Sequence, residues 1–213
     1  MLGRGLAARL YSYVVRYDSA FAPNPFYGYC TLATCKPTIR KSARIGDWIV
    51  GCGSDAKGVR RGGHLVYAMR VTEVASFQQY WNDPRFESKK PERRGSRKQS
   101  CGDNIYRQRP DGLGWAQLDS FHTLPDGSAN IRHINRDTGV DRVLISDDYC
   151  YFGGEGPAIP PPFRNYGGRD ICKKGIGQTV FDDPALIRDF AEWCRALGRG
   201  YQGAPWDWVA ARG

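Results

Sequence analysis

The stretch Gly46-Asp-Trp-Ile-Val-Gly-Cys-Gly-Ser54, followed at residues 63–74 by GHLVYAMRVTEV, predicts two neighbouring β-strands. The first segment opens with a turn and continues as a short hydrophobic strand, whose later glycines allow another backbone or a ligand to come close. In the second segment, alternate residues from Leu65 to Val71 are apolar, which is the period of a strand that buries one face. We therefore expect the two strands to pair as the central hairpin of a sheet.

The flanking segments complete an α+β pattern. Alternation over residues 10–17 predicts a first strand, and residues 140–152 predict another strand that ends at a pair of glycines. A Ser-x-x-Gln capping box at residues 76–79 predicts a short helix. Asp183 and Pro184 precede an apolar stripe at helical spacing, which predicts a C-terminal helix at about 183–198. Between these elements, residues 111–139 are expected to form turns and short edge strands.

The composition favours a single folded domain over residues 1–213 with an anionic partner. Hydrophobic residues make up 41% and aromatic residues 13% of the chain, which excludes a disordered protein. The formal net charge is +9, and nucleic acid is the first partner that such a charge suggests. Nine lysines and arginines stand against three acidic residues between positions 85 and 109, so we expect a solvated basic loop there.

The seven cysteines are scattered without regular spacing, which does not suit the disulfide framework of a secreted protein. The N-terminal segment is a poor signal peptide, because polar residues interrupt its apolar stretch. No run of eighteen apolar residues is present, so no contact with a membrane is expected. These features favour a reducing, cytoplasmic location.

The sequence assigns no metal, no cofactor and no catalytic residue. Cys30 and Cys35 are separated by four residues, wider than a usual zinc-binding pair, and no second close Cys/His pair follows. Nucleophilic catalysis needs a cysteine or serine beside a histidine and an orienting acid, and the sequence does not bring His64, His122 or His133 near any cysteine. The usual phosphate-binding, dinucleotide-binding, nucleophile-elbow and metalloprotease motifs are absent from the sequence.

Aromatic and small polar residues gather in the expected loops, which suits the recognition of a nucleobase. A base that has left its stack offers two faces for stacking and a polar edge for hydrogen bonds. The expected pocket residues are Asn24, Phe26, Tyr27, Trp48, Gly53, Ser54, Trp81, Asp103, Asn104 and Tyr106. The expected phosphate-binding residues of the basic loop are Lys89, Lys90, Arg93, Arg94, Arg97 and Lys98.

The order of these motifs resembles two known groups of proteins. Residues 46–54, 63–74 and 77–90 resemble the middle of EVE domains, in the PUA-like superfamily that also contains ASCH domains. The whole chain, with YCTLATCKP at 29–37, CGDNIY at 101–106 and LISDDYCYFG at 144–153, is similar to the nucleotide modification associated domain 2 family, Nmad2. That family is known mainly from bacterial and phage gene neighbourhoods concerned with DNA modification and defence.

The resemblance implies a PUA-like (EVE/ASCH-like) mixed β-barrel with flanking helices and a pocket for a modified base. Ser54 would lie at the pocket wall, and Trp48 on the strand that leads to it. Gly53 stands where many EVE domains have a histidine, and the basic loop has no counterpart there. The identity of the ligand therefore does not transfer.

The sequence is compatible with three functions. The leading hypothesis is a non-catalytic protein that recognises a modified base, with DNA favoured over RNA: the basic loop binds phosphates and the pocket holds one flipped base. The alternative is an enzyme acting on a nucleotide or base, with Asp103, Asn104 and Tyr106 or a cysteine as its chemical groups. A third hypothesis is an interaction subunit of a defence complex that docks a protein partner through the tail at 201–209, which carries Trp206 and Trp208.

Overall fold

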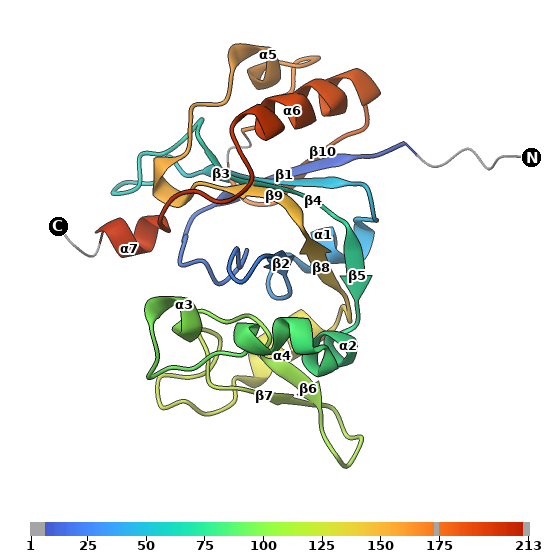
Figure 1. Ribbon diagram of the computed structural model, residues 1–213, viewed down its shortest axis with the longest axis vertical. Coiled ribbons are helices and arrows are strands. Elements are labelled where there is room, and N and C mark those ends of the chain that lie inside the picture. The colour runs from blue at the N-terminus through green and yellow to red at the C-terminus, as the bar shows by residue number, and fades with distance from the viewer. Residues whose placement is uncertain (1–6, 173–174, 211–213) are drawn as a thin grey trace, which may run out of the picture. The chain divides into compact units, whose positions relative to one another are not determined.

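The computed structural model describes residues 7–172 and 175–210, and the chain divides into two compact units. Unit 1 contains the segment up to Tyr17, residues 43–71 and the segment from Asp148 onward. Unit 2 contains residues 18–42 and 72–147. Each unit has its own β-sheet and helices, which are labelled in Figure 1, so the expected α+β class is confirmed.

Unit 1 is built on a six-stranded sheet with the strand order β10-β1-β3-β4-β9-β11. Its strands are β1 (Leu10–Val15), β3 (Trp48–Gly53), β4 (Leu65–Arg70), β9 (Asp148–Tyr151), β10 (Gln178–Phe181) and β11 (Gly200–Tyr201). Strand β3 pairs parallel to β1 and antiparallel to β4. The predicted pairing of the two central strands is therefore confirmed.

The predicted C-terminal helix is α6 (Pro184–Ala196), which lies along one face of this sheet in Figure 1. Its start is fixed by Asp183, whose carboxylate accepts hydrogen bonds from the backbone N–H groups of Ala185 and Leu186. The buried side of α6 contributes Leu186, Ile187, Phe190, Ala191 and Cys194 to a core shared with the sheet. Unit 1 also contains η2 (Gly153–Glu155), α5 (Pro161–Arg164) and α7 (Trp206–Ala210).

The predicted docking tail forms part of α7. Trp206 and Trp208 are half-buried rather than exposed, and a methyl group at Gly154 would meet the ring of Trp206 at 2.9 Å. Trp206 therefore packs within unit 1. Docking of a partner through this tail stays a prediction.

Unit 2 holds a three-stranded antiparallel sheet in the order β2-β8-β5 and a separate two-stranded hairpin. The sheet strands are β2 (Cys30–Leu32), β5 (Glu73–Ala75) and β8 (Val143–Ser146), and the hairpin strands are β6 (Tyr106–Gln108) and β7 (Trp115–Gln117). Its helices are α1 (Pro37–Ser42), α2 (Phe77–Asn82), η1 (Pro84–Lys89), α3 (Arg97–Ser100) and α4 (Ile131–Thr138). The expected capping box at the start of α2 is present, formed by Ser76 and Gln79.

The expected closed barrel is wrong: within residues 7–172 and 175–210, none of the three sheets closes on itself. The sheets stay open because two segments, each predicted as a single long strand, divide between two sheets. Residues 63–74 divide into β4 and β5, because Val71 donates its backbone N–H to Asp47 whereas Thr72 donates to Ile145. Residues 140–152 divide in the same way into β8 and β9. Each segment thus supplies strands to two sheets.

Two expectations about loops are also corrected. The basic segment at 85–109 is not one continuous loop, since it contains most of η1, the whole of α3 and all of β6. A second capping box, formed by Ser96 and Gln99, starts α3. Residues 111–139 contain a helix, α4, where only turns and strands were expected. Asn130 caps α4 by accepting a hydrogen bond from the backbone N–H of His133.

Arg40 is a fully buried side chain of unit 2 that joins two distant segments. Its guanidinium donates to the carbonyl oxygens of Cys35, Asp137, Val140 and Arg142, at 2.6 to 2.9 Å. Carbonyls at the end of a helix have no partner within the helix, and the negative end of the helix dipole favours a cation. Arg40 therefore caps the C-terminal end of α4 and fastens it to the turn after β2.

Arg40→Met should lower the free energy of unfolding by about 3–5 kcal/mol, because several buried carbonyl groups lose their donor. Urea denaturation followed by circular dichroism measures the change. Lys41→Met is the matched control, since Lys41 is the exposed neighbour on the same helix. Equal stabilities for the two variants would contradict the role given to Arg40.

Candidate functional site

Cys35 lies in a tight turn of unit 2 between strand β2 and helix α1. Its φ angle is 56° and that of Lys36 is 40°, so two consecutive non-glycine residues occupy the left-handed region. Such a conformation costs about 1–3 kcal/mol per residue and persists where the surroundings enforce it, as they commonly do at functional sites. Cys35 is partly exposed, whereas the other six cysteines are buried. A reagent or substrate can therefore reach Cys35 most easily.

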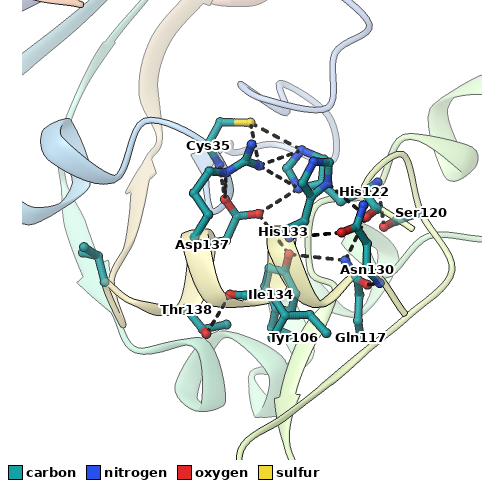
Figure 2. Close-up of polar contacts among 12 residues, drawn as sticks. Cys35, Tyr106, Gln117, Ser120, His122, Asn130, His133, Ile134, Asp137 and Thr138 are labelled. Atoms are coloured by element: carbon teal, nitrogen blue, oxygen red, sulfur yellow. Dashed lines mark hydrogen bonds and ion pairs between the residues drawn. The ribbon is translucent and has the colours of Figure 1, made fainter. Parts of the chain in front are cut away.

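His122 and Asp137 complete a constellation around this thiol (Figure 2). The Sγ atom of Cys35 lies 3.4 Å from Nε2 of His122. On the other side of the ring, Nδ1 of His122 lies 2.7 Å from Oδ2 of Asp137. The carboxylate holds the ring proton on Nδ1, which leaves Nε2 to exchange a proton with the thiol. The three side chains come from three separate segments of unit 2.

The carboxylate of Asp137 is fully buried and saturated with donors. Besides His122, its oxygens accept hydrogen bonds from the hydroxyl of Tyr106 at 2.9 Å, from Nε of Arg136 at 3.0 Å and from the backbone N–H of Cys35 at 3.1 Å. Burial raises the pKa of Asp137, but the hydrogen bond and charge of His122, together with Arg136, hold this pKa well below its usual range. Asp137 is therefore ionised at neutral pH.

The charges around the thiol favour a thiolate–imidazolium pair. Burial raises the pKa of Cys35, but the hydrogen bond and charge of His122 outweigh it, so the pKa lies below its ordinary value. Burial also lowers the pKa of His122, yet Asp137 and Cys35 together raise it above its ordinary value. The pKa of Cys35 is thus lowered and that of His122 is raised, and both shifts favour the charged form of the group. A thiolate is the nucleophilic form of cysteine.

Neighbouring residues hold the imidazole in place. The carbonyl oxygen of His122 accepts from Nδ1 of His133 at 3.0 Å and from Nε2 of Gln117 at 3.2 Å. Tyr106 and Gln117 are partners across the β6–β7 hairpin, which places the Tyr106 hydroxyl beside Asp137. Burial and the neighbouring carboxylate raise the pKa of Tyr106, so its hydroxyl stays protonated and donates. His122 is thus held by hydrogen bonds at its backbone carbonyl, and its ring is held by the hydrogen bond between Nδ1 and Asp137.

Several of the predicted pocket residues form a buried polar network in unit 2 instead of an open cavity. The side-chain oxygen of Asn24 accepts from Nζ of Lys89 at 2.7 Å, and Asp103 accepts from Thr31 and Tyr80 at 2.7 and 2.8 Å. Asn24, Phe26, Asp103, Asn104 and Tyr106 are all buried. Tyr106 belongs to the constellation around Cys35, and Trp81 lies half-exposed beneath the ammonium of Lys90 at 4.2 Å.

Trp48, Gly53 and Ser54 belong to unit 1. Trp48 is buried in the core beneath α6. A methyl group at Gly53 would lie 2.2 Å from the carbonyl oxygen of Arg61, so this glycine makes room for backbone. Ser54 is buried and its hydroxyl oxygen accepts the backbone N–H of Ala56 at 3.1 Å. Recognition of a base by these residues stays a prediction.

The predicted phosphate-binding lysines differ in their exposure to solvent. Lys89 is fully buried and donates to Asn24 and Tyr29, so its ammonium is not accessible to a phosphate, contrary to expectation. Burial lowers the pKa of Lys89 to about 8. Lys90 and Lys98, with the predicted pocket residue Tyr27, line a surface hollow of about 390 Å³. Its other lining residues are Glu87, Ser88, Glu92, Ser96 and Gln99.

The remaining arginines of the basic segment are on the surface. Arg93 lies over the ring of Phe121 at 4.7 Å and 3.9 Å from the carboxylate of Asp119. Arg94 and Arg97 are exposed. Phosphate binding by these residues stays a prediction.

Sequence reasoning considered a cysteine as a reactive group and named His122, but it did not bring His122 to Cys35. It missed Asp137, which lies in α4, a helix that was not expected. The available signal was local: Asn130 at a cap position, Ile131 and Ile134 at helical spacing, and Gly139 at the helix end predict α4. No local pattern links residues 35, 122 and 137, which are brought together only by the fold.

No group of three or more His, Cys, Asp or Glu residues with the arrangement of a metal site occurs among the described residues. No helix in the described part of the chain is long and apolar enough to cross a membrane.

Fold and site together define an α+β protein with a cysteine–histidine–aspartate constellation in its second unit. Residues 7–212 match the family model described as nucleotide modification associated domain 2, so the chain belongs to that family. The resemblance to this family noted in the sequence is confirmed, and the family's description associates the domain with nucleotide modification. Neither a curated protein nor a solved structure matches the chain.

Cys35 should be alkylated by iodoacetamide with a pH midpoint below the ordinary thiol value of 9.0, because His122 favours its thiolate. His122→Ala should move the midpoint upward, since burial then raises the thiol pKa without opposition from the imidazole. Rates measured by peptide mass spectrometry between pH 5 and 10 test this. His64→Ala is the control, because His64 lies in unit 1. An unchanged midpoint in His122→Ala would show that the two side chains are not coupled.

Proposed function

We propose that the chain is a cysteine-dependent acyl-transfer enzyme of nucleotide or DNA modification, with Cys35 as nucleophile, His122 as general acid–base and Asp137 as the group that orients His122. The observation that carries this proposal is the continuous contact from Sγ of Cys35 through the His122 ring to the Asp137 carboxylate, at 3.4 and 2.7 Å. A nucleophile in contact with a base that a third group orients is the arrangement on which acyl transfer by cysteine and serine enzymes depends.

The first half-reaction forms an acyl-enzyme. The Cys35 thiolate attacks the carbonyl carbon of an ester, thioester or amide, the C–S bond forms, and the C=O π pair moves to the oxygen. When the C=O bond re-forms, the bond to the leaving group breaks and the leaving group takes the proton from Nε2 of His122. A thioester on Cys35 and a neutral imidazole remain.

The second half-reaction restores the starting state. An amino or hydroxyl group of a nucleotide, or water, attacks the thioester carbon and gives its proton to Nε2 of His122. The C–S bond breaks, which returns the thiolate–imidazolium pair. The family's association with nucleotide modification supports a nucleotide as one of the two substrates. The acyl group would then be added to the nucleotide, or removed from it when water is the acceptor.

Incubation with p-nitrophenyl acetate should release a burst of nitrophenol and leave one acetyl group on the peptide that contains Cys35. Cys35→Ala should abolish the burst and the adduct, because the nucleophile is gone. Stopped-flow absorbance and peptide mass spectrometry measure both. Thr38→Ala is the control, as an exposed residue of the neighbouring helix α1. A wild-type chain without an adduct on Cys35 would overturn the proposal. Nucleosides recovered from reactions with DNA and acyl thioesters then identify the acceptor.

A second candidate function, recognition of a modified base, is favoured by the hollow that brings together Tyr27, Lys90 and Lys98. Its volume of about 390 Å³ is within the usual range of small-molecule sites, roughly 300–1,000 Å³. Tyr27 offers an exposed ring for stacking and the two lysines offer charge for a phosphate. This function is compatible with the first, since a DNA-modifying enzyme must also bind its substrate.

If the basic segment binds phosphates, the affinity for a DNA duplex should fall with salt at a slope of about 0.9 per phosphate contact in a log–log plot. Lys98→Gln should flatten this slope and leave the preference for modified over plain DNA unchanged, because phosphate contacts carry no base information. Fluorescence anisotropy at several salt concentrations measures both. Lys41→Gln is the matched control on another exposed lysine. Binding that does not depend on salt would exclude this function.

A further inference from the structure

We infer that Arg136 stabilises the negative charge that develops on the substrate's carbonyl oxygen when Cys35 attacks it. The inference rests on the proposed acyl-transfer function and assigns a further catalytic residue to the same site. Arg136 precedes Asp137 in α4 and its side chain is 41% exposed. One side of its guanidinium therefore contacts the site residues, and the other side is accessible to a bound molecule.

The position of the guanidinium supports this role. Nη2 lies 3.9 Å from Sγ of Cys35, and 3.5 and 3.4 Å from Nδ1 and Nε2 of the His122 ring. Nη2 is nearly equidistant from the two ring nitrogens, so the cation lies against the His122 ring and close to the sulfur at the same time. Nε is bound to Asp137, which fixes the fork of the guanidinium.

A second observation shows why such a donor is needed. The backbone N–H of the nucleophilic residue commonly helps to bind the oxyanion in acyl-transfer enzymes. Here the N–H of Cys35 donates to Oδ1 of Asp137 at 3.1 Å and is therefore occupied. The electrostatic stabilisation that this group usually supplies must come from another donor close to Sγ. The guanidinium of Arg136 and the His122 ring are both in hydrogen-bond contact with Sγ.

The guanidinium of Arg136 has a further donor that could bind the oxyanion. Nη1 of Arg136 has no hydrogen-bond partner within residues 7–172 and 175–210. When a carbonyl carbon bonds to Sγ, its oxygen lies one bond farther from the sulfur, within reach of the same guanidinium. A fixed cation at this position strengthens its interaction with the oxygen as negative charge develops there. Arg136 would thus act on the transition state more than on the bound substrate.

Two reagents separate this role from a simple effect on the thiolate. Iodoacetamide alkylates a thiolate by displacement of iodide and creates no oxyanion on its carbonyl, whereas p-nitrophenyl acetate acylates it through a tetrahedral oxyanion. Rates for both are measured across a pH series, so that each is expressed per thiolate. Arg136→Gln should lower the acylation rate about 100-fold, the usual effect of removing an oxyanion donor, and change the alkylation rate little. Arg136→Lys should give an intermediate acylation rate, because it keeps the charge but loses the fork.

Arg132→Gln is the matched control, as an exposed arginine on the same helix. An equal decrease of both rates in Arg136→Gln would show that Arg136 only positions or ionises the thiol, and equal rates for Arg136→Gln and wild type would show that it has no role. Either result overturns this inference and leaves the proposed function intact. Rapid alkylation of wild type without any acylation overturns the proposed function and this inference together. Thermal unfolding of each variant confirms that the comparison is made between folded chains.

Discussion

The geometry of the site depends on one buried carboxylate. Asp137 lies in the last turn of α4, where the negative end of the helix dipole disfavours an acidic residue. Three side chains and the backbone of Cys35 donate to it, and they come from separate segments of unit 2. A buried charge is tolerated only with such complete pairing. The pairing that stabilises Asp137 is therefore also what brings the thiol and the imidazole together.

Arg40 is the second part of the same arrangement, because its guanidinium donates to the backbone carbonyl oxygen of Asp137. It neutralises the carbonyl ends of α4 and holds the carbonyl of Cys35, so the left-handed turn is fixed from both sides. Burial lowers the pKa of Arg40 to about 10, which still leaves it charged at neutral pH. Cys35 lies in a strained turn between a strand and a helix, and charge-assisted hydrogen bonds from Arg40 balance this strain.

Local periodicity was sufficient to predict β3, β4 and α6 from the sequence, because each has an uninterrupted apolar pattern. It failed where one continuous pattern serves two sheets, as at Val71 and Thr72, since hydrophobicity does not record which strand supplies the hydrogen bonds. It failed at α4, whose apolar positions are few. Cys35 was visible in the sequence, but no local pattern marked it, because its contacts with His122 and Asp137 are made across 87 and 102 positions of the chain.

The breaks between β4 and β5 and between β8 and β9 are also places where the chain passes from one unit to the other. The backbone passes between the units four times, after residues 17, 42, 71 and 147. Neither unit is a contiguous stretch, so no single deletion or proteolytic cut releases one of them whole. Transfer of the thiol-bearing unit to another protein would require residues 42 and 72 to be joined by a new linker. Recombination at one breakpoint would therefore exchange only parts of a unit and leave at least one unit with segments from two different parents.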